Sequence, residues 1–356
     1  MRRFTLLTAL ATGLLLGSTP RLPAPPLPPA TGSSGHSIER HLLDDTDLLV
    51  VVNVKEIVKS RFFTKSAIND VEKLLGRDEV KPYLKDAGID PLKDVDQVVV
   101  SMGKSSHSDK PARDREDGPV IVLQGKFDKA RIDKQLAKLA EDGKHVKAVE
   151  HNKAKFHRFD NGPYIAALDK TALLICGSKA QVAEQLSRVA GKSKAKLKYP
   201  AISAFLKARA KSPAAVDVIA LESMVTGTSY SGVKGPGGAV EQVKHRTLGD
   251  EGFKQFTVQV KVKDDARGTL RMDVKKAGDL DSKLKEGQKV VAEMKEGLNN
   301  LPPGVGIPAE QLAKMREFVN SIKVKGDKGA VVYEATGTGD QLSALLKSFA
   351  LLAGGR

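Results

Sequence analysis

Three histidines recur at a spacing of six residues in one lysine-rich stretch of the chain. On a regular strand, His145, His151 and His157 would share one face, with Asp160 close by. A strand advances about 3.3 Å per residue, so neighbouring histidines would be about 20 Å apart and could not ligate one ion unless the chain folds back. The spacing therefore favours a solvated hairpin, and we expect no metal and no other cofactor.

A serine-rich segment is the nearest approach to a nucleophile motif. The run from Gly227 to Ser231 resembles the hydrolase pattern G-x-S-x-G, but Ser231 stands where the second glycine is needed. The next histidine, His245, follows in a stretch typical of a loop. We therefore predict a long hairpin loop here and no catalytic triad.

Carboxylates, glycines and the single cysteine also favour structural roles. Asp47, Asp90, Asp94 and Asp96 are the carboxylates that an enzyme would use, yet their setting is typical of helix caps and turns. The glycine-rich run 232–238 lacks the phosphate-loop frame. Cys176 ends an apolar run, which predicts a small buried side chain rather than a reactive thiolate.

Positive charge is the property of this sequence that says most about its possible partners. The chain of 356 residues carries a formal charge of +15, and most of the excess falls between residues 122 and 212. Because the sequence has no Trp and only 4% aromatic residues, it offers little for base stacking or sugar platforms. The candidate anion-binding residues are the basic residues of the connector: Lys192, Lys194, Lys196, Lys198, Lys207, Arg209 and Lys211.

The start of the sequence has the pattern of an export signal. Arg2 and Arg3 precede an apolar stretch, Phe4–Leu16, that is too short to span a bilayer. We predict a signal peptide over residues 1–19, with a retained anchor as the alternative. Residues 20–40 are rich in Pro, Gly and Ser, which predicts a disordered extended spacer. The protein is therefore expected to be exported, as a periplasmic, cell-envelope or secreted protein.

The remaining chain alternates apolar strand-like runs with amphipathic helical patterns. Strand pairs interrupted by single helices predict an α+β fold, with antiparallel or mixed sheets and helices packed on one face. Its length suits two related lobes, residues 41–191 and 214–356, joined by a basic connector over residues 192–213.

A local match between the two lobes predicts an internal repeat. The run Asp169–Ile175 aligns with Asp327–Tyr333, and a helix pattern follows each run, beginning near Gln181 and Gln341. Such agreement also arises from common turn chemistry, which is the alternative explanation.

The leader, the proline-rich spacer, the strand from Leu48 to Val54 and the turn and strand from Gly88 to Val100 together carry a resemblance. On these features the chain resembles uncharacterised exported bacterial proteins with tandem α+β repeats. The resemblance implies export and architecture, and it supplies no catalytic residues.

These observations favour a binding or structural protein over an enzyme. We expect a basic surface that binds an anionic partner in the cell envelope, such as a polysaccharide, a lipid headgroup or an envelope protein, and we do not expect nucleic acid. The alternative is a hydrolase whose site is dispersed over both lobes. A concave pocket that brings a carboxylate and a histidine together would favour that alternative.

Overall fold

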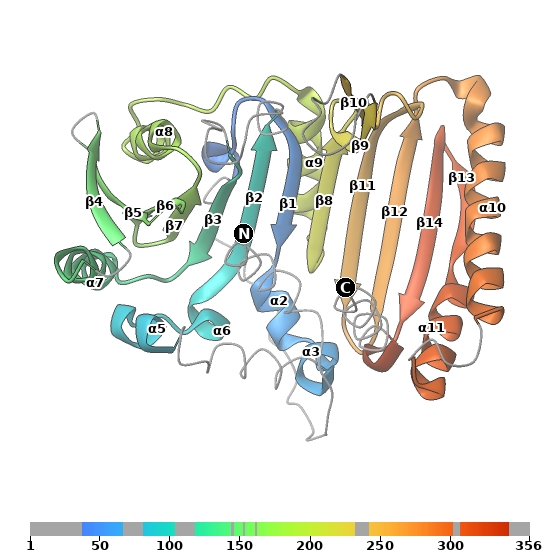
Figure 1. The fold of residues 1–356 in the computed structure, drawn as a ribbon, viewed down its shortest axis with the longest axis horizontal. Coiled ribbons are helices and arrows are strands. Elements are labelled where there is room, and N and C mark those ends of the chain that lie inside the picture. The colour runs from blue at the N-terminus through green and yellow to red at the C-terminus, as the bar shows by residue number, and fades with distance from the viewer. Residues whose placement is uncertain are drawn as a thin grey trace.

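The computed structural model describes residues 38–66, 81–103, 118–143, 146–151, 154–160, 162–231, 242–301 and 307–341. Its helices lie around one broad sheet (Figure 1). They are η1 (Ile38–His41), α2 (Val54–Lys59), α3 (Arg61–Ser66), α5 (Lys81–Ala87), α6 (Pro91–Asp94), α7 (Lys129–Glu141), α8 (Lys179–Val189), α9 (Pro200–Lys211), η4 (Ala277–Asp279), α10 (Leu280–Asn299) and α11 (Ala309–Ser321). Among these described helices, none combines the length and apolar character needed to cross a membrane.

The sheet has 12 antiparallel strands in the order β13-β14-β12-β11-β8-β1-β2-β3-β7-β6-β5-β4. The first half of the chain contributes β1 (Thr46–Val52), β2 (Val95–Gly103), β3 (Val120–Gly125), β4 (Val146–His151), β5 (Ala154–Phe159), β6 (Tyr164–Asp169) and β7 (Ala172–Cys176). The second half contributes β8 (Val216–Leu221), β11 (Phe253–Val262), β12 (Ala266–Val274), β13 (Lys323–Asp327) and β14 (Ala330–Gly337). The predicted antiparallel α+β class is therefore confirmed.

The two halves do not have separate sheets, as the prediction of two lobes implied. β1 pairs with β8 along its length, with Val50 opposite Val218, and β1 pairs with β2 on its other side. Apolar β-branched residues fill both strands, so each strand can be buried in the interior of a sheet. One continuous sheet therefore joins the parts of the chain on either side of the connector.

Each half arranges its strands in the same order from this junction. The first half runs β1-β2-β3-β7-β6, and the second half runs β8-β11-β12-β14-β13. The predicted sequence match falls at equivalent positions, since Asp169 ends β6 and Asp327 ends β13. A common origin of the halves stays a prediction, and the shared strand order is consistent with it.

Helices cover both faces of the sheet in the first half, which corrects the expectation of one covered face. Leu174 of β7 packs in a core cluster with Val182 of α8, whereas the adjacent Leu173 packs with Ile132 of α7. Successive residues of a strand point to opposite faces, so α7 and α8 lie on opposite sides of β7. Asp128 caps α7 by accepting a hydrogen bond from the Arg131 N–H.

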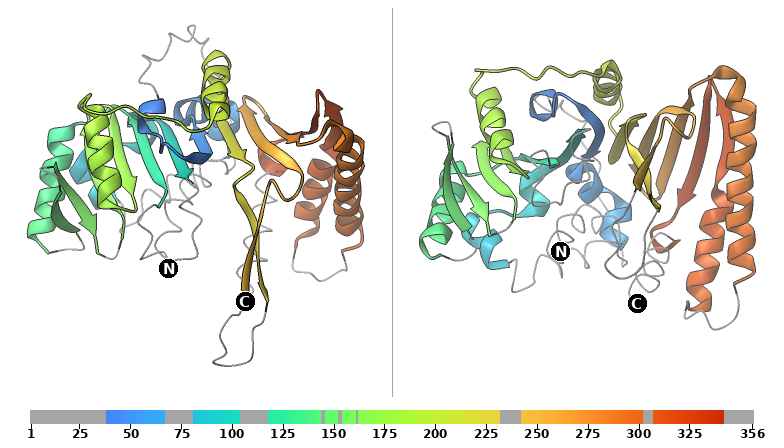
Figure 2. Two further views of the ribbon diagram at one scale, coloured as in Figure 1. Left: turned by 90° about the horizontal axis from the view of Figure 1, so that it is seen from above. Right: turned by 45° about the horizontal axis from the view of Figure 1, so that its top comes forward.

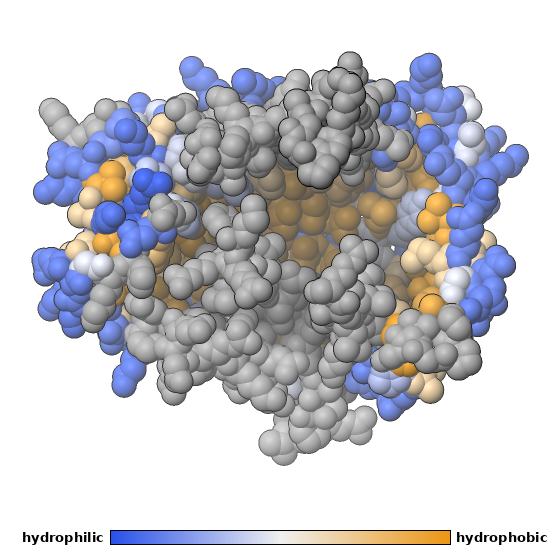
Figure 3. All heavy atoms as spheres, in the orientation of Figure 1, coloured by the Kyte–Doolittle hydropathy of each residue, from blue (hydrophilic) through white to orange (hydrophobic). Residues whose placement is uncertain are grey.

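The face that carries α7 continues across the centre of the sheet as a row of aliphatic side chains. Val100, Val50, Val218 and Val258 lie side by side on neighbouring strands, and each is partly buried. Figure 3 shows apolar residues in the centre of the molecule, between residues drawn in grey. In the second half, α10 and α11 flank this same face, where Leu280 and Leu284 of α10 and Met272 of β12 pack against one buried cluster that contains Val331.

A second, two-stranded sheet leaves the main body between β8 and β11. It consists of β9 (Val225–Ser231) and β10 (Gln242–Thr247), and it projects on the side of the main sheet opposite to α9 (Figure 2, left). The stretch around His245, predicted as loop, is therefore a strand. Small and polar residues dominate both strands, so the apolar alternation that normally reveals a strand is missing.

Candidate functional site

Four of the candidate lysines lie on one extended segment, residues 192–199, which we call the strap. The strap joins α8 to α9 along the rim of the molecule (Figure 2, right). Lys192, Lys194, Lys196 and Lys198 are all exposed, and the residues between them are partly buried. This alternation is that of an extended backbone with one face outward, so the predicted lysine stripe is a real surface feature.

The carboxylate and carbonyl of Asp44 hold the strap against the body. The N–H of Lys196 donates to Asp44 Oδ1 at 2.8 Å, and the N–H of Lys198 donates to the Asp44 carbonyl oxygen at 2.8 Å. On the inward side, Leu197 and Tyr199 pack against the main core cluster. Backbone hydrogen bonds and apolar contacts together fix the direction in which the lysines face.

Arg188 of α8 supports this anchor from below. Only 5% of its side chain is exposed, and its guanidinium contacts Asp44 at 2.9 Å and Glu184 at 2.8 Å. A further N–H donates to the Leu42 carbonyl oxygen. Charge-assisted hydrogen bonds of this kind are about twice as strong as neutral ones, so Asp44 is held in place for the strap.

A shallow hollow of about 520 Å³ opens beside the strap. Lys192, Lys194 and Lys196 line it together with Asp44 and Glu184. Arg188 contacts both carboxylates. The four strap lysines and Arg188 together place five cationic side chains around these two carboxylates. The hollow therefore favours anions, although it is of mixed charge.

The three basic residues of α9 divide between the surface and the interior. Lys207 and Lys211 are exposed. Arg209 instead forms an ion pair with Asp217 of β8 at 3.1 Å, and their side chains are 11% and 0% exposed. Burial lowers the pKa of Arg209, and the adjacent Asp217 carboxylate opposes that shift. Arg209 is thus occupied in holding α9 to the sheet, which removes it from the predicted anion-binding set.

The described histidines do not assemble a metal site. His151 ends β4 and His157 lies in β5, opposite Ala148, while His145 lies outside the described residues. Burial lowers the pKa of His157, with a smaller opposing effect of Asp133. Within the described parts of the chain there is no group of three or more possible metal ligands.

The predicted carboxylate cluster is dispersed into caps and pairs. Asp90 caps α6 and contacts Lys93 at 2.7 Å, and Asp94 accepts a hydrogen bond from the Asp90 N–H. Asp96 contacts Lys55 at 3.4 Å, and Asp47 accepts a hydrogen bond from the hydroxyl of Ser223, in the turn after β8. These partners explain the four residues structurally, as their sequence context predicted.

The serine-rich segment and Cys176, the two nucleophile candidates that the sequence did not favour, lie in structural settings. Gly227, Ser229 and Ser231 lie in β9, where His245 of β10 is opposite Thr228, and the glycine-rich run 232–238 lies outside the described residues. Cys176 is buried, and burial raises the pKa of its thiol to about 12.

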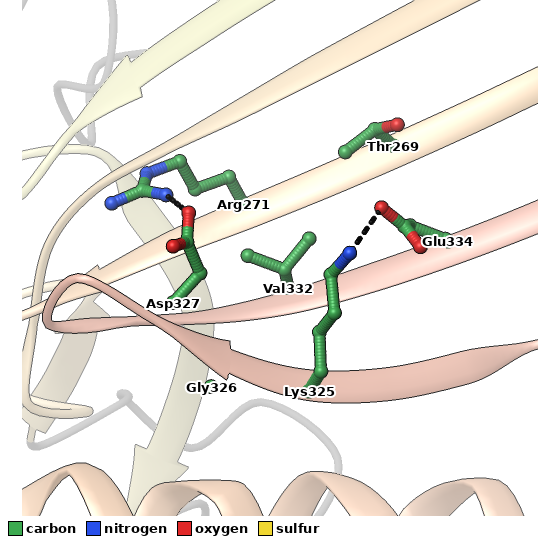
Figure 4. A pocket seen from close by; sticks show the side chains of 7 residues that line it. All are labelled: Thr269, Arg271, Lys325, Gly326, Asp327, Val332 and Glu334. Atoms are coloured by element: carbon green, nitrogen blue, oxygen red, sulfur yellow. Dashed lines mark hydrogen bonds and ion pairs between the residues drawn. The ribbon is translucent and has the colours of Figure 1, made fainter.

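A second hollow, of about 450 Å³, lies in the second half on the face of the sheet opposite to α10 and was not predicted (Figure 4). It is formed by β12, β13 and β14. Its cations are paired, Arg271 with Asp327 at 2.8 Å and Lys325 with Glu334 at 2.8 Å. Paired charges leave little attraction for an added anion, so we place the candidate site at the strap.

Comparisons with known proteins give no family for this chain. No protein-family model matches the sequence, and no curated protein matches it. Two solved structures are similar in three dimensions, and both are of TP0453. Crystal form IV has a TM-score of 0.42 at 7% identity, over 85% of this chain and 92% of that chain. Crystal form I has a TM-score of 0.41 at 10% identity, over 90% and 98%. Neither the identities nor the TM-scores support transfer of a function.

Proposed function

We propose that this chain is an exported binding protein that uses the strap and the exposed lysines of α9 to hold an anionic partner of the cell envelope. The observation that carries the proposal is the charge of one short segment. Residues 191–213 contain seven basic residues and no acidic residue, and six of the seven are exposed lysines. A fixed cationic surface of this kind attracts polyanions and releases their counterions.

The arrangement of the arginines supports the same reading. Arg188 and Arg209, which could grip a phosphate or sulfate with two parallel hydrogen bonds, are used inside the protein. Hydrated lysine ammonium groups are left at the surface. Such groups bind through charge and tolerate variation in the partner, as expected for a binder of envelope polysaccharides or phosphates.

Export is the part of the proposal that depends on residues 1–40. The charged start, the short apolar stretch and the proline-rich spacer support a signal peptide followed by an extended stalk. Outside the cytoplasm, polysaccharides and phosphate-bearing envelope polymers are the common polyanions. Mass spectrometry of the mature N-terminus from the native host tests the cleavage that we propose near residue 19.

Retention on immobilised heparin tests the binding surface. We expect a variant with Lys192, Lys194, Lys196 and Lys198 changed to Gln to elute at clearly lower salt than the natural protein. The matched control changes four exposed lysines of the second half to Gln, namely Lys254, Lys276, Lys285 and Lys323. Equal elution of the two variants, which have the same net charge, would refute a specific role for the strap.

A further inference from the structure

The strap combines exposed lysines with a stretch of extended backbone, and this geometry narrows the class of partner. Resting on the function proposed above, we infer that the strap recognises an extended polyanionic chain lying along it, and not a compact anion or a membrane surface. The backbone runs without a bend from Lys194 to Leu197, with bends at Lys192, Ser193 and Lys198, and four lysines point outward from alternate residues. At about 3.3 Å per residue, alternate Cα atoms of an extended chain lie about 6.6 Å apart, so the four lysines span at most about 20 Å.

The line is prepared before a partner binds. Hydrogen bonds to Asp44 fix the backbone at Lys196 and Lys198, and the N–H of Lys192 donates to the Ser187 carbonyl oxygen at 2.9 Å. Hydrogen bonds thus fix the backbone of the strap at Lys192, Lys196 and Lys198. Because the backbone order already exists, a linear polyanion does not have to supply it on binding.

Apolar groups near the strap face inward, which disfavours a lipid surface. Leu197 and Tyr199 are partly buried against the core, so the strap presents only charge. Among described residues, the exposed large hydrophobic side chains are Val290 and Met294, which lie on α10 in the other half. Stable adsorption to a bilayer normally needs apolar insertion in addition to charge.

Dependence on ligand length provides the first test. Heparin oligosaccharides of defined, increasing length are titrated calorimetrically, beside inorganic sulfate and vesicles with an anionic lipid. We expect affinity to rise with length until the oligosaccharide spans about 20 Å and then to level off. The salt dependence should weaken in the four-lysine variant, with a slope smaller by about 3. Tight binding of sulfate, or binding to vesicles alone, would overturn the inference.

A change of register provides a second test at constant composition. The double substitution Lys194→Ala with Ala195→Lys keeps the charge but moves one ammonium group off the outward line. We expect the affinity for the long oligosaccharide to fall about fivefold, because one charge contact contributes about that factor to the binding constant near physiological salt. Unchanged affinity would contradict a linear site, even if the four-lysine variant still showed that the surface binds anions.

Substitution of Asp44, which anchors the strap, provides a third test. A site that binds by charge alone and a site that depends on the linear arrangement of its lysines predict opposite effects. Asp44→Ala removes a carboxylate, so a purely charge-driven site would bind more tightly. A linear site should bind about fivefold more weakly, because Lys196 loses the acceptor that fixes its backbone, whereas the Lys198 N–H keeps the carbonyl oxygen of residue 44. Asp44→Asn keeps an acceptor for the Lys196 N–H and should restore most of the affinity. Circular dichroism of both variants verifies folding, and tighter binding by a folded Asp44→Ala protein would refute the inference.

Discussion

The two halves of this protein share a strand order but treat one face of the sheet in opposite ways. In the first half, the face of β7 that carries Leu174 is buried beneath α8. In the second half, no helix within the described residues covers the equivalent face of β12 and β14, which carries Arg271 and Glu334 beside a shallow hollow. The other face carries helices in both halves, α7 in one and α10 in the other.

The difference shows that strand order alone does not decide how many layers of helices pack on the sheet. β7 is buried at every position, so both of its faces are apolar. β12 alternates Arg271 with Met272, so it can face water on one side. In the first half α8 covers this face, and the strap begins after the end of α8. The binding surface is thus a product of the extra layer.

Loss of an ion pair should give the largest difference in stability between the part of this face beneath α9 and the part beside the second hollow. Arg209→Ala leaves the Asp217 carboxylate buried without a cationic partner, so we expect the free energy of unfolding to fall by about 3–5 kcal/mol. Arg271→Ala beside the second hollow should cost about 1 kcal/mol or less. Urea denaturation measures both values. Equal costs would show that the Arg209 site is solvated, contrary to the structure.

Truncation of apolar side chains should give the next largest contrast. Leu174→Ala should lower the free energy of unfolding by about 3 kcal/mol, because it opens a cavity between the sheet and α8. Val332, at the equivalent position, is also buried at 5% exposure but lies beside the second hollow and is smaller than leucine, so Val332→Ala should cost about 1 kcal/mol. Should both cost the same, the second half must have a covering layer on that face.

The helix caps at equivalent positions allow a finer comparison. Ser178 caps α8 in a reciprocal pair with Gln181, which also donates to the Gly118 carbonyl oxygen. Thr338 and Gln341 form the same reciprocal pair after β14, in an exposed setting. We expect Ser178→Ala to cost about 1.5 kcal/mol and Thr338→Ala about 0.5 kcal/mol, by thermal denaturation. A larger effect at Thr338 would reverse the comparison.

The smallest expected effect is a pH dependence at the turn between β6 and β7. Burial opposes ionisation of Asp169, but hydrogen bonds from Thr171 and the charge of Arg40 outweigh it, so its pKa is lowered. The resulting stabilisation is present above the unfolded pKa, about 3.9, and is lost as the pH falls through the lower folded value. Asp169→Asn should therefore flatten the fall in melting temperature between pH 5 and about pH 2. An unchanged slope would exclude this contribution, and Thr171→Val should give an intermediate slope.

Local patterns in the sequence were sufficient for the strongly apolar elements. The apolar run that ends at Cys176 is strand β7, and the strand expected from Leu48 to Val54 is β1, Thr46–Val52. Elements with weak apolar contrast were missed. β13 is a short edge strand in which most positions are exposed, so no alternation marks it. The helix α9 was included in the connector because its lysines obscured the buried Ile202.

Long-range partners account for what the sequence did not reveal about the site. The row of lysines was visible in the sequence, because lysine occupies every second position from 192 to 198, and these positions are the exposed ones. The partner that fixes it, Asp44, lies 152 residues before Lys196, and Arg209 meets its partner only when α9 packs on the sheet. Local periodicity carries no information about such pairs. The pairing of β1 with β8 was missed for the same reason.

The seam between β1 and β8 also bears on how the molecule can be divided. A protease cut within the strap would leave two pieces that still share a hydrogen-bonded strand border. Each piece alone would present that border as a bare apolar edge, the type of surface that recruits strands from other chains. The pieces should therefore remain associated after nicking, and neither should be soluble when expressed without the other.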